Sequence, residues 1–365
     1  MMVFPPVRKG THDLISSLRF EDFEVSWAGP CLRKDLFAFG SEDGRLLFAD
    51  LDGVVQGKAE KAAPSGEAIN GVACFDRWMS VSTRSEVMLW TIPLPGETLM
   101  GARIPFGVHG VIVGQSGYFL APLGHAGLLF YHPEIGREQP ITVSRSVSED
   151  SYFYRVISLR AGNGEEIVAC AMRRGGVAAM TFKGMDHQHT VSTLTFDGLD
   201  VIDLCPLHVD KFPEAAAAVG RDGTIILFKD VLHDRHPGTI KYDSISGTAY
   251  RILIARGYLF LLTSEGLYVI AGLIDLFLNH TAENPVTPVL AVPMEAVDAN
   301  LGSQQWLWIV MNEGALRFDV ELLDHITPAN LEHGELREMR ATVIAPSWRS
   351  KQQEQKSTVV LAQAS

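Results

Sequence analysis

The sequence predicts an all-β protein assembled from repeated units, and two observations carry that prediction. One pattern returns along the 365 residues: an apolar run, a turn with Gly or charged residues, and a second apolar run that usually ends on an aromatic residue. The pattern occurs seven times with a mean spacing of 45 residues, the length of one blade in a propeller. The second runs close on Phe48, Trp90, Phe130, Phe182, Phe228, Val269 and Phe318.

Each unit contains a hairpin of two strands. The clearest copy runs from Leu36 to Asp50, and its turn contains the pair Asp43-Gly44. Gly adopts the positive φ that such a tight turn requires, so this pair between two β-rich runs is a strong hairpin signal. The other hairpins span residues 78–90, 118–132, 167–182, 215–230, 258–270 and 306–319.

A strand-like run precedes every hairpin, and a more polar run follows several of them. The polar runs, such as 190–195 and 289–292, are typical of outer edge strands, whereas the preceding runs are typical of innermost strands. We therefore predict a seven-bladed β-propeller of four-stranded antiparallel blades, with short helices near the C-terminus at 273–279 and 330–340. The innermost runs are 23–27, 69–75, 111–113, 153–159, 201–205, 250–254 and 296–299.

The repeats favour one domain over residues 1–345, followed by a C-terminal tail over 346–365; a two-domain β protein is the alternative. An open ring would expose two sheet edges, so a terminal strand must complete the last blade. The candidates are Val3-Phe4, Ala341–Ala345 and Thr358–Ala362, and we expect Ala341–Ala345 to close the ring. The predicted blades span roughly 20–60, 66–105, 108–146, 152–197, 199–245, 247–293 and 295–345.

Composition indicates a cytoplasmic protein with a large core. The chain is 47% hydrophobic and 20% charged, and its net charge of −12 without an extended block of Lys or Arg argues against nucleic acid. The N-terminus lacks an apolar signal segment, and the most apolar stretch, 258–278, is broken by polar residues, so no membrane span is expected. Isolated cysteines among apolar neighbours predict buried thiols in a reducing compartment: Cys31, Cys74, Cys170 and Cys205.

Residues 20–320 resemble the WD40 family of seven-bladed propellers. The closest copy combines Phe23–Trp27, Phe39–Gly44 and Leu47–Asp50. The family's Trp-Asp dipeptide is replaced by sequences such as Trp90-Thr91 and Phe318-Asp319, so the repeats are divergent. Other replacements are Leu129-Phe130-Tyr131-His132 and Leu227-Phe228-Lys229-Asp230, and His109-Gly110 is similar to the family's Gly-His dipeptide.

The resemblance implies that the turns between second and third strands share one face with the connections between blades, a face that often binds partners. Arg is enriched at interface hot spots because its planar guanidinium pairs with carboxylates and stacks on aromatic rings. We therefore predict partner binding through Arg84, Arg173, Arg174 and Arg221, with Trp348 of the tail as a second candidate. The apolar end of the tail, Val359–Leu361, is either a disordered terminus or a strand added to a partner.

Catalytic motifs are sparse. No nucleophile elbow, phosphate-binding Gly-rich loop or zinc-protease motif occurs. We predict a non-catalytic interaction scaffold or regulatory subunit of a multiprotein complex, with protein partners and no cofactor. The alternative is an enzyme or a small-ligand or metal-binding propeller acting through its loops. The H-x-H and H-x-x-H spacings that favour this alternative comprise His187, His189, His233 and His236.

Overall fold

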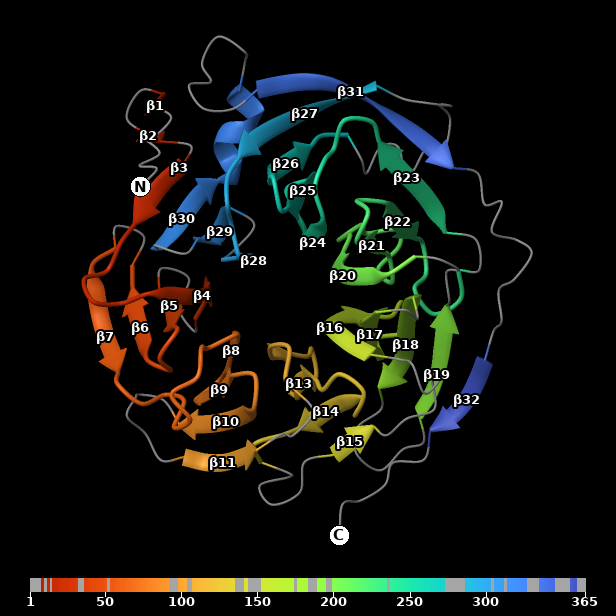
Figure 1. Cartoon of the computed structure of the whole chain (residues 1–365). Coiled ribbons are helices and arrows are strands. Elements are labelled where there is room, and N and C mark those ends of the chain that lie inside the picture. The colour runs from red at the N-terminus through yellow and green to blue at the C-terminus, as the bar shows by residue number, and fades with distance from the viewer. Residues whose placement is uncertain are drawn as a thin grey trace.

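Seven antiparallel blades surround a central axis in the computed structural model (Figure 1). The expected all-β, seven-bladed propeller is confirmed, and each blade begins with its innermost strand. The structure describes residues 8–9, 12–13, 15–31, 36–50, 53–91, 98–103, 107–134, 141–143, 152–173, 176–182, 189–194, 199–234, 237–272, 286–302, 305–311, 314–326, 335–344 and 355–359.

The first four blades follow the order of the chain. Blade one contains β4 (Val25–Pro30), β5 (Phe37–Ser41), β6 (Leu46–Ala49) and β7 (Val55–Ala59). Blade two contains β8 (Gly71–Phe75), β9 (Trp78–Ser82), β10 (Glu86–Thr91) and β11 (Thr98–Arg103). Blade three contains β12 (Ile112–Val113), β13 (Phe119–Pro122), β14 (Leu128–Tyr131) and β15 (Ile141–Val143). Blade four contains β16 (Tyr152–Arg160), β17 (Glu166–Arg173), β18 (Gly176–Phe182) and β19 (His189–Leu194).

The remaining blades recruit strands from both ends of the chain. Blade five contains β20 (Val201–Pro206), β21 (Ala216–Gly220), β22 (Ile225–Phe228) and β23 (Gly238–Tyr242). Blade six contains β24 (Ala249–Ala255), β25 (Tyr258–Thr263), β26 (Gly266–Ile270) and β27 (Val286–Pro293). Blade seven contains β28 (Asp298–Leu301), β29 (Trp306–Met311), β30 (Gly314–Asp319) and β3 (Ile15–Leu18). A separate pair consists of β1 (Arg8–Lys9) and β2 (His12–Asp13).

Apolar side chains of neighbouring blades pack together between the sheets. The aromatic residues predicted to close each hairpin lie on third strands, where Phe130 of blade three stacks on Phe182 of blade four at 4.8 Å between ring centroids. Phe318 of blade seven likewise contacts Phe260 of blade six edge to face at 5.9 Å. Such aromatic contacts bury apolar surface between neighbouring blades and thereby stabilise the ring.

The N-terminal part of the chain closes the ring. Strand β3 pairs antiparallel with β30 from Ile15–Phe318 to Leu18–Ala315, so an N-terminal strand completes blade seven. The expectation that Ala341–Ala345 closes the ring is wrong, because residues 341–344 pair with β23 instead. The Ile-Ser-Ser-Leu sequence of β3 has only two apolar residues, and its pairing with a strand about 300 residues away leaves no local pattern.

One long strand joins blades five and six at their outer edge. In β31 (Glu335–Ile344), the first six residues pair with β27 and the last four pair with β23, as the blue strand at the periphery of Figure 1 shows. The predicted helix over 330–340 is therefore wrong from Glu335 onward. The helix near the C-terminus is a 3₁₀ turn, η1 (Val320–His325), whereas the predicted helix 273–279 lies outside the described residues.

The tail contributes a fifth strand to blade four. Strand β32 (Gln355–Val359) pairs antiparallel with β19, from His189–Val359 to Thr193–Gln355. The sequence leaves this tail open between a disordered terminus and a strand added to a partner, whereas the structure pairs residues 355–359 with the chain's own blade four. Outer edges of three blades are thus covered by C-terminal segments, which removes unpaired backbone groups from these edges.

Candidate interaction surface at the mouth of the central channel

The turns between second and third strands, here called the tips, lie on the same face as the connections between blades. This follows from antiparallel pairing, and we call it the tip face. Three tips are joined to the connection that leads into the next blade: the N–H groups of Ile69, Val108 and Ala249 donate to the carbonyls of Ser41, Arg84 and Arg221 at 2.8–3.0 Å. The backbone of each tip is thereby fixed, while the Arg84 and Arg221 side chains are exposed.

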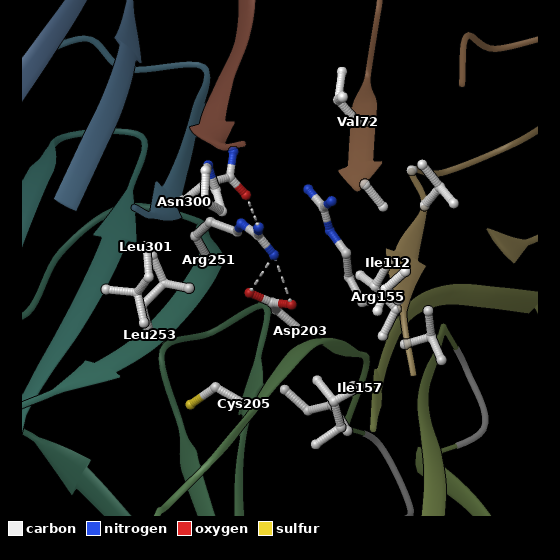
Figure 2. A pocket seen from close by; sticks show the side chains of 18 of the residues that line it. Val72, Ile112, Arg155, Ile157, Asp203, Cys205, Arg251, Leu253, Asn300 and Leu301 are labelled. Carbon is white, nitrogen blue, oxygen red and sulfur yellow. Dashed lines mark hydrogen bonds and ion pairs between the residues drawn. The ribbon is translucent and has the colours of Figure 1, made fainter. Parts of the chain in front are cut away.

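The central channel opens on this face and contains a cavity of about 360 Å³ (Figure 2). Residues of the innermost strands line it. Charged and polar groups such as Arg155, Asp203 and Arg251 occupy one part, whereas apolar residues such as Ile157 and Leu253 line another. The cavity is therefore lined by both charged and apolar side chains.

Four charged residues alternate in sign at equivalent positions of consecutive innermost strands. Arg155 lies on β16, Asp203 on β20, Arg251 on β24 and Asp298 on β28, at steps of 48, 48 and 47 residues. We call these four residues the charged layer. The repeat thus places two positive and two negative side chains at one depth of the channel.

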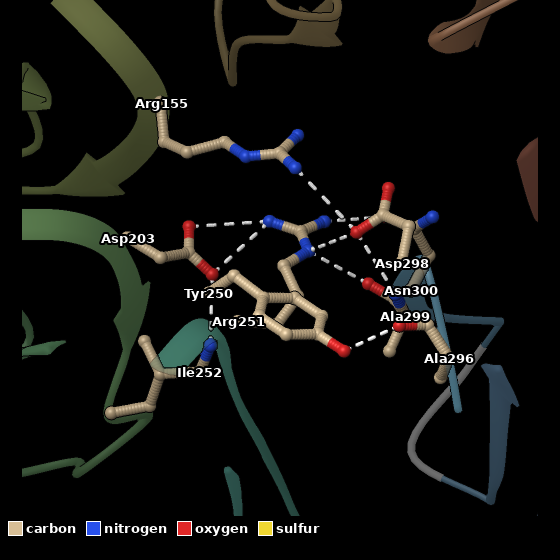
Figure 3. Close-up of polar contacts among 9 residues, drawn as sticks. All are labelled: Arg155, Asp203, Tyr250, Arg251, Ile252, Ala296, Asp298, Ala299 and Asn300. Carbon is tan, nitrogen blue, oxygen red and sulfur yellow. Dashed lines mark hydrogen bonds and ion pairs between the residues drawn. The ribbon is translucent and has the colours of Figure 1, made fainter. Parts of the chain in front are cut away.

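Arg251 is the centre of the charged layer (Figure 3). Its guanidinium contacts both carboxylate oxygens of Asp203 at 3.2 Å, and its Nε lies 2.9 Å from Oδ1 of Asp298. Asp203 is fully buried and also accepts a hydrogen bond from the Ile252 N–H at 2.8 Å. Arg155 reaches Asp298 from blade four at the longer distance of 3.5 Å. The layer therefore ties the inner strands of four blades together.

Mutual pairing keeps Arg251 and Asp298 charged. Burial disfavours the charged form of Arg251, but the carboxylates of Asp203 and Asp298 outweigh it and raise the pKa of this guanidinium. Burial also opposes ionisation of Asp298, yet Arg251 and Arg155 hold the pKa of this carboxyl below its ordinary value. A pair with such stable charges is suited to structure and to anchoring, and it offers no proton donor or acceptor near neutral pH.

The structure brings predicted arginines of adjacent blades to one carboxylate. Asp200, at the start of blade five, lies 3.0 Å from Nε of Arg221 and 4.0 Å from Nε of Arg173. Arg84, Arg173 and Arg221 all lie on the tip face, in blades two, four and five. The tips of blades one and six carry Glu42 and Glu265 instead, so the tip face has a basic and an acidic part. Arg174 and Trp348 lie outside the described residues.

A second set of side chains adjoins these arginines at the start of blades three and four. Nε2 of His109 is hydrogen-bonded to the Tyr152 hydroxyl at 2.5 Å, and its ring centroid lies 4.8 Å from that of Tyr154. Burial, and then the charges of Arg155, Arg173 and Arg84, lower the pKa of His109 to about 4. The imidazole is therefore neutral at pH 7, in part because the three nearby guanidinium groups disfavour its positively charged form.

The histidines of the alternative metal-binding hypothesis are only partly described. His233 is 77% exposed and its Nδ1 pairs with Asp230 at 2.9 Å, while His189 lies in β19; His187 and His236 fall outside the described residues. Within the described part of the chain, no group of three or more His, Cys, Asp or Glu side chains is placed to hold a metal ion. Metal binding by the four histidines therefore stays an untested alternative.

The cysteines are thiols, two of which approach each other. Cys170 and Cys205 are buried as predicted, whereas Cys31 and Cys74 are half-buried, with 3.9 Å between their sulfur atoms. The hydrogen bond to Cys31 and burial raise the pKa of Cys74. Both thiols line the channel cavity, and the raised pKa of Cys74 makes that thiol a poor nucleophile.

Comparisons with known proteins identify the fold. No protein-family model matches the sequence, and no curated protein is similar to it in sequence. Among solved structures, the chain is similar to the β-propeller domain of Myceliophteria thermophila Cps50 (Swd1), with 11% identity, a TM-score of 0.60, and coverage of 84% of this chain and 99% of that one.

Two other solved structures show how widely this fold is used. The structure of U3-55K matches with 10% identity, a TM-score of 0.55, and coverage of 84% of this chain and 98% of that one. Streptogramin B lyase matches with 8% identity, a TM-score of 0.57, and coverage of 84% and 97%. The last of these is named as an enzyme, so the shared propeller does not by itself decide function. In the described residues, no helix is long and apolar enough to span a membrane.

Proposed function

We propose that this protein is a non-catalytic interaction platform, a scaffold or regulatory subunit that binds one or more proteins through its tip face. The observation that carries the proposal is that Arg84 and Arg221 lie on tips with a fixed backbone, and that Arg173 and Arg221 meet at Asp200 on the same face. Rigid backbone with exposed arginine side chains is the composition of a docking hot spot. Arg174 belongs to the proposed surface because it follows Arg173 in the sequence, and Trp348 remains a second proposed contact.

The charges of the channel support binding over catalysis. The carboxylates of the charged layer are paired with arginines, so they are poorly suited to general acid or base catalysis. The net charge of −12 supports protein partners over nucleic acid. We further propose a cytoplasmic location, which the sequence composition supports.

The test is affinity purification of the tagged full chain from its native host, followed by mass spectrometry and a metal assay. We expect stoichiometric partner proteins with the wild type, and their loss when Arg173, Arg174 and Arg221 are changed to Glu. The matched control is Arg256→Glu, since Arg256 lies at the β24–β25 turn on the opposite face and pairs with Glu321. Partner capture that survives the triple change, or a lone chain with bound metal at His187, His189, His233 and His236, would contradict the proposal.

A further inference from the structure

The side chains around His109 form a compact polar and aromatic group at the channel mouth, which we call the rim cluster. Tyr154 is its centre: the guanidinium carbon of Arg155 lies 5.6 Å from the Tyr154 ring centroid, and that of Arg173 lies 5.8 Å from it. Two arginines of blade four thus lie beside one ring: Arg155 on the innermost strand and Arg173 at the tip. The rim cluster comprises Arg84, His109, Tyr152, Tyr154, Arg155 and Arg173.

Each of two acids near the rim cluster pairs with one arginine inside the cluster and one outside it. The distance to the arginine inside the cluster is the longer one in both cases. Asp298 lies 2.9 Å from Arg251 but 3.5 Å from Arg155. Asp200 lies 3.0 Å from Arg221 but 4.0 Å from Arg173. Since an ion pair weakens with distance, Arg155 and Arg173 retain capacity for a further acceptor.

The local charge is opposite in sign to that of the whole chain. Five arginines and four acids lie in and around the rim cluster, which leaves a surplus of one positive charge on a protein of net charge −12. The arginines are Arg84, Arg155, Arg173, Arg221 and Arg251, and the acids are Glu67, Asp200, Asp203 and Asp298. His109 adds none at pH 7. A single negative charge is therefore attracted here, whereas a polyanion meets repulsion from the rest of the surface.

We propose that the rim cluster binds the carboxylate of a Glu or Asp side chain in an extended segment of a partner protein, an inference that rests on the interaction function proposed above. A carboxylate matches the planar fork of a guanidinium and carries one charge. A phosphate group, with nearly two charges, is the competing ligand that the experiment distinguishes from a carboxylate. Half-buried Tyr152 and Tyr154 supply apolar contact for the rest of the segment.

The experiment titrates the full chain with an acetylated and amidated Ser-Val-Glu-Val-Ser peptide, which carries one carboxylate, and follows the imidazole of His109 by NMR. A carboxylate bound between the arginines raises the pKa of His109 from about 4, because it offsets their positive charge. The Gln version of the peptide leaves that pKa unchanged. Arg173→Gln weakens the Glu peptide about tenfold, the effect of losing one charge-assisted hydrogen bond, whereas Arg256→Gln on the opposite face does not.

Further arms separate the ligand sources. Arg155→Gln should also weaken binding of the Glu peptide. Because Arg155 lies deeper in the channel, thermal unfolding of this variant is measured as well. If Arg155→Gln fails to fold, Arg173→Gln and Arg84→Gln still test the proposal. Free glutarate that binds as tightly as the peptide, or a phosphoserine peptide that binds more tightly than the Glu peptide, overturns the proposal. So does a Glu peptide that leaves His109 unchanged at millimolar concentration. If the peptide test fails but partner capture still depends on Arg173, Arg174 and Arg221, the proposed interaction function is supported and only the carboxylate ligand is rejected.

Discussion

At the residue scale, the charged layer illustrates how repetition turns single side chains into a network. A buried carboxylate such as Asp203 is costly to remove from water, and the structure offsets that cost with two contacts from Arg251 and one from the Ile252 N–H. Loss of either partner leaves an uncompensated charge inside the ring. The layer is therefore a point where small chemical changes have large effects on stability.

We expect Asp203→Ala to lower the free energy of unfolding by about 3–5 kcal/mol, because the change leaves Arg251 buried with one carboxylate fewer. Asp324→Ala is the matched control: this aspartate is 49% exposed and pairs with Arg256 at 3.8 Å, so its loss costs less than about 1 kcal/mol. Denaturant unfolding of both variants measures the difference. Equal losses would show that the charged layer does not stabilise the ring.

The sequence contains a signal for the charged layer, although our sequence analysis missed it. When the predicted innermost strands are aligned, Arg155, Asp203, Arg251 and Asp298 occupy equivalent places with alternating sign. Alignment reveals equivalence around the ring, but it does not show that Arg155 pairs with Asp298 across the channel. That contact depends on how far the Arg155 side chain extends across the channel, which the spacing of residues in the sequence does not show.

At the element scale, local sequence patterns predict the hairpins but do not predict the strand pairings between segments that are distant in sequence. The signals for a hairpin are apolar runs and a turn pair such as Asp43-Gly44 or Asp222-Gly223, and they lie within a few residues of each other. The structure has positive φ at both glycines. The segment Glu335–Arg340 is rich in good helix formers, yet six backbone pairings with β27 hold it as a strand. Tertiary pairing overrides propensity wherever the partner strand is far away in sequence.

Strand β31 is expected to protect the outer edges of blades five and six. A chain that ends at residue 334 loses the partner of β23 and β27, so their amides should exchange with deuterium about tenfold faster, as expected for loss of one hydrogen bond each. A chain that ends at residue 354 keeps β31 and loses β32, so faster exchange should be confined to β19 of blade four. Hydrogen–deuterium exchange with mass spectrometry reads out both. Unchanged protection of β23 and β27 in the shorter chain would contradict a protective role for β31.

At the scale of the whole molecule, closure makes a rigid surface from separate blades. Chain termini are distributed unevenly around the ring: the N-terminal β3 completes blade seven, while β31 and β32 cover the outside of blades four to six. The tips of blades two, four and five can hold fixed positions only while all sheets remain in register around the channel. The proposed docking surface is therefore a property of the closed ring, because no single blade contains it.

Removal of β3 tests this dependence. A chain that begins at residue 20 loses the four residue pairs between β3 and β30, which we expect to cost about 2–6 kcal/mol at 0.5–1.5 kcal/mol for each hydrogen bond. It also exposes β30 as an unpaired edge, so light scattering should detect self-association. A chain that ends at residue 354 is the control, since it loses a strand of similar length without opening the ring. Thermal unfolding distinguishes the two deletions, and a peptide of residues 12–20 added in trans should restore part of the lost stability. If both deletions unfold at the same temperature as the full chain and remain monomeric, then β3 is only an additional edge strand and packing between blades is sufficient to hold the ring closed.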